Sequence, residues 1–279
     1  MRALDLIGKT EKPSPEQPFG VSEVTTPSGL SIYYQAGPKR LYRLNGEEVP
    51  SVSQVLDILE KGGLSWWGMK VGIEGVCLLH ESLTGEWWEH PDAVLALLKE
   101  NKLTVNHVRD TAADRGTNVH TALETWVSTG VTPDPRFFPE SERGYVEGLV
   151  AFINDAHPFA RQSELMVAST DGYAGRFDLF AHLDGEVVVK TYPKRSPIRA
   201  NVSGAWLLDL KTSKSVYSSY HLQLAAYDHA MSECGYGEAD EMGVVRVTAD
   251  GRYELVAGRA GYTDFLHILS AYRVLKSIA

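Results

Sequence analysis

The sequence predicts an α/β fold in which a central mixed β-sheet is flanked by helices. Short apolar runs with branched and aromatic residues, bounded by Gly, Ser and Pro, lie between residues 161 and 212 and are typical of strands. On both sides of this region apolar residues recur every three or four positions, as they do in amphipathic helices. Helices before and after a run of strands favour one sheet with helical layers packed against it.

Residues 105–279 contain the elements predicted for this core. The first helix should bury an apolar stripe that includes Val119, Leu123 and Trp126. The Asp184-Gly185 and Asp250-Gly251 pairs are predicted to form tight hairpin turns. In chain order, we expect helices at residues 105–128 and 139–156, strands at 161–169, 173–183, 185–191 and 205–212, a helix ending at 233, strands at 242–248 and 252–257, and a helix at 263–278.

Residues 1–104 are expected to form a separate N-terminal region. Its first 29 residues are rich in Pro, Ser, Thr and Glu, which predicts loose structure. Residues 30–49 combine strand-like runs with turn pairs and predict a β-hairpin. Short helical segments follow from residue 50 onward. We therefore expect a hairpin and a mostly helical cap beside the core.

Three charged residues in the predicted strands form the candidate catalytic centre. Asp209 and Lys211 stand two apart on one strand and therefore project from the same face. If the strand that carries Asp178 lies beside it, two carboxylates and an ammonium group converge. Such a group binds a hard divalent cation through oxygen atoms and leaves the lysine for the substrate or for a water molecule. The pattern indicates the active centre of a metal-dependent nuclease.

A second acid-x-Lys triplet, Glu100-Asn101-Lys102, provides an internal control. It ends an apolar helical run, and residues two apart on a helix do not share a face. It also lacks an upstream Gly-x-x-Asp strand. We interpret Glu100 and Lys102 as a solvated helix end.

Further motifs accompany the first triplet. They are a helical histidine motif from Arg115 to His120, an acid at Glu164, a Gly175-x-x-Asp178 strand, and a Gln223-x-x-x-Tyr227 helix. In this order the motifs resemble those of the PD-(D/E)XK nuclease superfamily, in particular its RecB-like branch, which includes exonucleases associated with CRISPR adaptation. The resemblance covers about residues 115–230.

The resemblance implies a restriction-endonuclease-like core and a metal-dependent DNA exonuclease that acts in DNA recombination, repair or end processing. It implies that Asp178, Asp209 and the backbone carbonyl of Leu210 hold Mg²⁺ or Mn²⁺, with His120 as a further ligand. Lys211 would position the attacking water or help to deprotonate it. Single-stranded or duplex DNA ends are the expected substrate. Whether a separate helicase or annealing protein takes part is left open.

Several alternatives remain open at this stage. Glu164 is a water-bridged metal ligand, the ligand of a second ion, or a structural acid paired with Arg161 or Arg176. Gln223 and Tyr227 share a helix face and either contact the site or form a structural pair at the end of the sheet. The alternative functions are a restriction-type endonuclease and a non-catalytic DNA-binding recombination scaffold. The helical histidine favours the exonuclease, and the complete set of acids and lysine argues against the scaffold.

The net charge of −9 means that DNA binding requires a local basic surface. The segment between the two metal-site strands contains four cations and no acid: Lys190, Lys194, Arg195 and Arg199. We interpret this segment as a DNA contact, with a solvated hairpin tip as the alternative.

Composition limits the cofactors and the compartment. Cys77 and Cys234 are too few for a four-cysteine iron–sulfur cluster, so none is expected, and both are interpreted as buried thiols. No apolar run approaches the ~20 residues that cross a bilayer. The N-terminus also lacks the long apolar region of a signal peptide. We therefore expect a cytoplasmic protein without a membrane partner.

Overall fold

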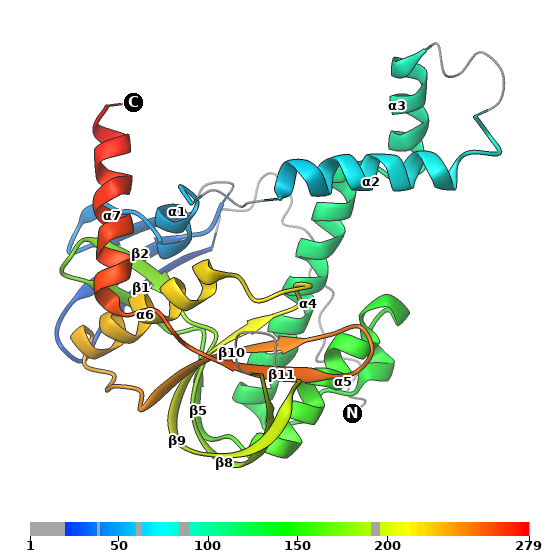
Figure 1. Ribbon diagram of the computed structural model, residues 1–279. Helices are drawn as coiled ribbons and strands as arrows, with labels where there is room; N and C mark the ends of the chain where they lie inside the picture. The colour runs from blue at the N-terminus through cyan, green and yellow to red at the C-terminus, as the bar shows by residue number, and fades with distance from the viewer. Residues whose placement is uncertain (1–19, 38–39, 60–62, 84–89, 191–195, 279) are drawn as a thin grey trace.

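A computed structural model of the chain describes residues 20–37, 40–59, 63–83, 90–190 and 196–278. It confirms a mixed α/β fold with a mixed sheet flanked by helices (Figure 1). The strand order in the central sheet is β11-β10-β9-β8-β5. These strands are β5 (Phe159–Ser163), β8 (Leu179–Val189), β9 (Ile198–Lys211), β10 (Glu241–Val247) and β11 (Tyr253–Ala257).

The central sheet combines both kinds of strand pairing. β10 runs parallel to β9, whereas β8 with β9, β5 with β8, and β11 with β10 pair antiparallel. The far end of β8 also meets β11, where Val189 lies opposite Leu255. Asp209 and Lys211 lie at the C-terminal end of β9, and Asp178 immediately precedes β8. The candidate catalytic residues therefore lie at the same end of two paired strands.

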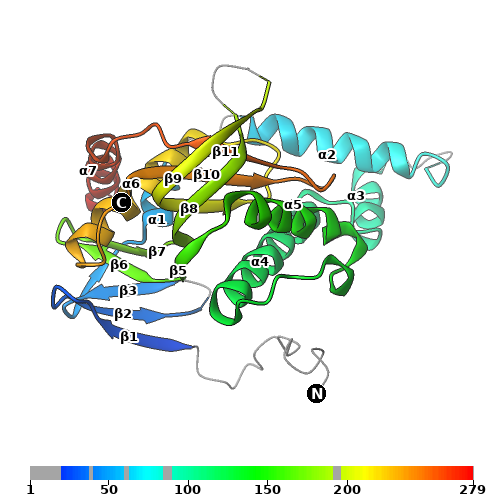
Figure 2. The same cartoon turned by 90° about the horizontal axis from the view of Figure 1, so that it is seen from below.

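Helices cover both faces of the sheet. One face packs on α4 (Val105–Thr129) and α5 (Glu140–Ala156), which lie side by side in Figure 2 and are joined through the short helix η3 (Pro135–Phe137). Their core includes the predicted stripe of Val119, Leu123 and Trp126. The other face packs on α6 (Ser218–Glu233), and α7 (Tyr262–Ser277) packs in turn against α6.

The N-terminal region begins with an antiparallel four-stranded sheet. The predicted hairpin at residues 30–49 is confirmed by β2 and β3, in which Ile32 lies opposite Leu44. Residues 21–25 were expected to be loose but form a strand on β2, because their backbone completes the edge of this sheet. The region contains β1 (Val21–Thr25), β2 (Ser31–Gln35), β3 (Leu41–Leu44), β4 (Glu47–Val49), α1 (Val52–Leu56), α2 (Leu64–Leu78) and α3 (Pro91–Glu100).

The hydrophobic core runs across the boundary expected at residue 104. A two-stranded sheet, β6 (Met166–Ser169) with β7 (Tyr173–Arg176), lies between the N-terminal sheet and α6. One buried cluster joins Ile32 and Val52 to Tyr173 and Phe265. By contrast, α2 and α3 extend away from this core (Figure 1). The division into two domains stays a prediction.

The prediction of a turn at Asp184-Gly185 is wrong. β8 continues through both residues, and Gly185 lies opposite Val202 of β9. A Cβ atom on Gly185 would lie 2.0 Å from the carbonyl oxygen of Asp155, at the end of α5. The glycine therefore lets a helix end approach the strand. Part of the predicted basic loop is also strand, because β9 begins at Ile198.

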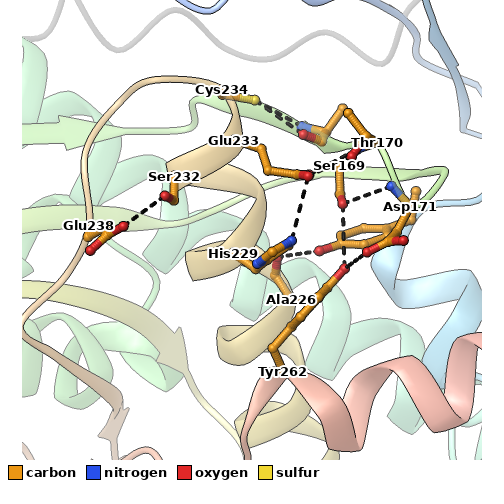
Figure 3. A network of polar contacts seen from close by, with 12 residues as sticks. Ser169, Thr170, Asp171, Ala226, His229, Ser232, Glu233, Cys234, Glu238 and Tyr262 are labelled. Carbon is orange, nitrogen blue, oxygen red and sulfur yellow. Dashed lines mark hydrogen bonds and ion pairs between the residues drawn. The ribbon is translucent and has the colours of Figure 1, made fainter.

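Polar contacts fix the β6–β7 turn to α6 and α7 (Figure 3). The Tyr262 hydroxyl donates to the carboxylate of Asp171 at 2.6 Å, and the Thr170 hydroxyl donates to Glu233 at 2.6 Å. His229 stacks on Tyr262 with ring centroids 3.6 Å apart. These contacts hold both helices on the β6–β7 sheet, whose second strand leads to Asp178.

The cysteines occupy two different environments. Cys234 is buried, and its thiol donates to the carbonyl of Ala168. Cys77 is exposed on α2, so the expectation of a buried thiol is wrong there. None of the helices in the described part of the chain is long and apolar enough to span a membrane.

Candidate metal centre

Four structural elements bring the predicted site residues together. β9 carries Asp209 and Lys211, and the residue before β8 is Asp178. His120 comes from the middle of α4, and Glu164 lies in the connection between β5 and β6. The site thus lies where the central sheet, a long helix and the small sheet meet.

His120, Glu164 and Asp178 form a group that could hold a metal ion. Each offers one ligand atom, and these atoms all lie within 4.8 Å of one another. His120 Nδ1 lies 3.5 Å from Asp178 Oδ1, and the Asp178 side chain is only 11% exposed. Asp178 Oδ2 accepts a hydrogen bond of 2.8 Å from the backbone N–H of Leu210. This bond fixes the carboxylate to the neighbouring strand and leaves its other oxygen facing the histidine.

Asp209 is not one of these three residues, so its role as a metal ligand stays a prediction, but it lies close to Asp178 and is paired with Lys211. Lys211 Nζ lies 2.7 Å from Asp209 Oδ1. Asp209 is 2% exposed, and its other oxygen, Oδ2, is buried without a hydrogen-bond partner in the described part of the chain. A buried carboxylate oxygen without a partner is costly. One strong acceptor of the pair is therefore left unsatisfied by the described residues.

Burial and the neighbouring charges together shift the pKa values of Asp209 and Lys211. Burial, reinforced by the negative charge of Asp178, raises the pKa of Asp209 to about 6. Burial alone would lower the pKa of Lys211, but the carboxylates of Asp209 and Asp178 outweigh it and raise that pKa. Lys211 is therefore an ammonium group near neutral pH. In that form it donates hydrogen bonds and does not accept a proton from water.

Glu164 forms one of the contacts that the sequence left open. Its carboxylate pairs with Arg176 Nε at 2.5 Å, and it is also one of the three residues that could hold a metal ion. Burial raises the pKa of Glu164 although Arg176 opposes this. Its backbone φ of 54° is in the left-handed region, which is uncommon for residues other than glycine. Such strain is often found at functional sites.

Gln223 and Tyr227 lie one turn apart on α6, where Tyr227 packs against the strand that leads to Asp178. Tyr227 is 4% exposed, and Gln223 Nε2 donates a long hydrogen bond of 3.4 Å to its hydroxyl. A Cβ atom on Gly175 would lie 2.5 Å from the Tyr227 ring. The glycine of the Gly-x-x-Asp strand therefore makes room for the tyrosine of the following helix. Tyr227 therefore packs against the strand that leads to Asp178, and direct contact of Gln223 or Tyr227 with a substrate stays a prediction.

Two neighbours of Lys211 were not predicted from the sequence. The Lys211 ammonium lies 5.0 Å from the centre of the Tyr220 ring. Arg246 on β10 lies in register with Lys211 and forms an ion pair of 2.6 Å with Glu254. The strand pattern of β10 places Arg246 on one face, but the parallel pairing with β9 is needed to identify its neighbour.

The two described cations of the basic segment form ion pairs with acids. Lys190 lies 3.2 Å from Glu254, and Arg199 pairs with Asp155 and Glu186. Lys194 and Arg195 lie outside the described residues. DNA binding by the segment stays a prediction, as does metal binding by the Leu210 carbonyl.

Comparison of the sequence with protein-family models and with curated proteins gives no match. The geometry of the site therefore carries the functional argument.

Proposed function

We propose that this chain is a metal-dependent deoxyribonuclease that removes nucleotides from DNA ends. The observation that carries the proposal is the group of His120, Glu164 and Asp178 beside Asp209, whose buried Oδ2 has no hydrogen-bond partner among the described residues. Oxygen ligands with one imidazole suit Mg²⁺ or Mn²⁺, and the imidazole favours Mn²⁺. The residues present thus fit a divalent cation.

The protein side chains have separable tasks in this proposal. Asp178, His120 and Glu164 would hold the cation, and Asp209 would add its free oxygen. A divalent cation at this site supplies a more acidic bound water and charge to stabilise the scissile phosphate. Lys211, held by Asp209, would donate hydrogen bonds to a phosphate oxygen or to the attacking water. Its raised pKa favours this role over that of a general base.

The proposal includes membership of the PD-(D/E)XK superfamily and its RecB-like branch. The motif order supports it, and so does the position of each motif: a histidine on a helix, acids at two strand ends and a glycine that accommodates Tyr227. A restriction-endonuclease-like core, an N-terminal cap, and a role in recombination, repair or end processing belong to the same proposal. A helicase or annealing partner remains an open part of it.

Digestion of end-labelled linear DNA and of covalently closed circular DNA tests the function. With Mg²⁺ or Mn²⁺, the proposal expects release of label from linear substrates and intact circles. Ca²⁺ should support little cutting. Cleaved circles would show the alternative restriction-type endonuclease, and binding without any cleavage would show the scaffold. Full activity in excess chelator would exclude the metal-dependent reaction.

A further inference from the structure

The segment after Lys211 presents two exposed side chains close to the candidate centre. Residues 213–217, here called the 213–217 loop, connect β9 to α6. Lys214 is exposed, and Tyr217 is 51% exposed although it is a large aromatic residue. Both side chains are therefore accessible to a ligand.

Aromatic contacts connect Tyr217 to the catalytic lysine. The rings of Tyr217 and Tyr220 lie 5.5 Å apart at an interplanar angle of 81°, an edge-to-face arrangement. The Tyr220 ring in turn lies 5.0 Å from Lys211 Nζ. The exposed tyrosine is therefore two contacts away from the group proposed to bind the scissile phosphate.

The 213–217 loop is held in place by the neighbouring strand. Arg246 Nη1 donates to the carbonyl oxygens of Ser213 at 3.5 Å and Lys214 at 3.3 Å. Arg246 is itself fixed by Glu254 through a hydrogen bond of 2.6 Å. Within the loop, the Ser213 hydroxyl donates to the carbonyl of Ser215 at 2.7 Å. A loop ordered before binding loses less conformational entropy when a ligand arrives.

An exposed aromatic ring and an exposed lysine three residues apart on one loop suit a nucleotide of a single strand. Aromatic side chains stack on unpaired bases, and lysines follow the phosphates between them. A base inside a duplex is already stacked and paired, so it gains little from Tyr217. We propose that the 213–217 loop is a nucleotide subsite in which Tyr217 stacks on an unpaired base and Lys214 contacts the adjoining phosphate. This inference rests on the proposed nuclease function and makes the site selective for single-stranded ends.

Binding of a single-stranded oligonucleotide with 2-aminopurine near its end tests the subsite. The measurement uses the full chain in Ca²⁺, so that cleavage is slow. Stacking on Tyr217 should quench the probe, and Tyr217→Ala should weaken binding by about 5- to 100-fold. Tyr217→Phe should retain both quenching and affinity. Phe137→Ala removes an equally exposed ring from η3, 54% exposed, and should change neither.

An abasic nucleotide at the probe position makes the test specific to stacking. Tyr217→Ala should weaken binding of the normal oligonucleotide but not of the abasic one, and should affect a blunt duplex much less. Lys214→Ala should reduce the log–log salt slope by about 0.7 on single strands. Equal losses on normal, abasic and duplex DNA would overturn the subsite, as would no loss at all.

The two proposals fail in distinguishable ways. If the wild-type chain neither binds nor cuts DNA, the proposed function is wrong and the subsite with it. If the wild type binds and cuts while Tyr217→Ala behaves identically, the subsite alone is wrong.

Discussion

Two ion pairs with buried acids lie next to each other on one face of the central sheet. Lys211 with Asp209 is at the end of β9, and Arg246 with Glu254 joins β10 to β11. Lys211 and Arg246 are in register on adjacent strands, so the pairs share a face. Both acids are nearly inaccessible: Asp209 is 2% exposed and Glu254 is 6% exposed.

The pairs differ in how completely their carboxylates are satisfied. Glu254 receives Arg246 Nε at 2.6 Å and Lys190 Nζ at 3.2 Å. Burial alone would raise its pKa, but these cations outweigh burial and hold the pKa below its usual range. Asp209 has Lys211 on one oxygen only, and burial raises its pKa to about 6.

The pKa values of the two buried carboxylates are therefore shifted in opposite directions. The Glu254 carboxylate has a cation on each side, whereas one oxygen of Asp209 has no hydrogen-bond partner among the described residues. Burial of an ion pair does not by itself identify a functional site. The unsatisfied oxygen and the adjacent His120–Glu164–Asp178 group distinguish the Asp209–Lys211 pair from the Glu254–Arg246 pair.

The largest effect is expected at the incomplete pair. Asp209→Asn and Lys211→Ala should each reduce DNA cleavage by about a thousandfold or more, because each removes several kcal/mol of stabilisation from the charged transition state. Cleavage rates at saturating DNA measure the loss, and circular dichroism with a thermal melt checks that the variants fold. A folded Asp209→Asn chain that cuts at the wild-type rate would contradict the assignment.

The complete pair should instead determine stability. Glu254→Gln leaves Lys190 and Arg246 without their shared carboxylate and should lower the free energy of unfolding by about 2–3 kcal/mol, since both cations keep some solvent. Urea unfolding at pH 7 measures the change. A loss below about 0.5 kcal/mol would mean that the pair is not structural.

The same variant has a defined pH dependence. Because the folded state lowers the pKa of Glu254 below its ordinary value of 4.5, the stabilisation from Glu254 is present above that pH and is lost as the pH falls through the folded-state pKa. The stability difference between wild type and Glu254→Gln should therefore be full at pH 7 and should shrink below about pH 4. A difference that stays constant down to pH 3 would contradict this account.

The smallest effect is expected at the second acid-x-Lys triplet. Glu100 and Lys102 are both exposed at the end of α3, as the sequence predicted. Glu100→Gln and Lys102→Ala should change stability by less than about 0.5 kcal/mol and leave cleavage unchanged. These variants also serve as matched controls for Asp209→Asn and Lys211→Ala. A large loss of cleavage in either would show that sheet context does not separate the two triplets.

Local sequence patterns predicted the helices and strands of this fold better than they predicted the contacts between those elements. The helix of His120 follows from its apolar periodicity, and the strand of Asp209 follows from an apolar and aromatic run bounded by turn residues, although β9 begins at Ile198 and not at residue 205. Two Asp-Gly pairs, however, gave the same turn signal with different outcomes. Gly251 has φ +79° in a hairpin turn, whereas Gly185 lies within a strand against the end of α5. Only the packing of a helix distant in sequence distinguishes them.

In the candidate site, too, local patterns predicted the residues but not all of their contacts. Motif order predicted Asp178, Asp209 and Lys211 as neighbours, and strand pairing brings them together. The contacts of Arg246 depend on parallel pairing between β9 and β10, which no local pattern specifies. The contact of Tyr220 with Lys211 likewise depends on how α6 returns to the sheet.

Direct titration of Mn²⁺ into the metal-free chain, followed by electron paramagnetic resonance, tests the central claim independently of catalysis. Saturable binding is expected for the wild type and for Glu100→Gln. Asp178→Asn and His120→Ala each alter one member of the candidate metal-binding group and should weaken Mn²⁺ binding by at least about tenfold. The absence of saturable binding in the wild type, or equal affinity in all four proteins, would contradict a metal centre at this site.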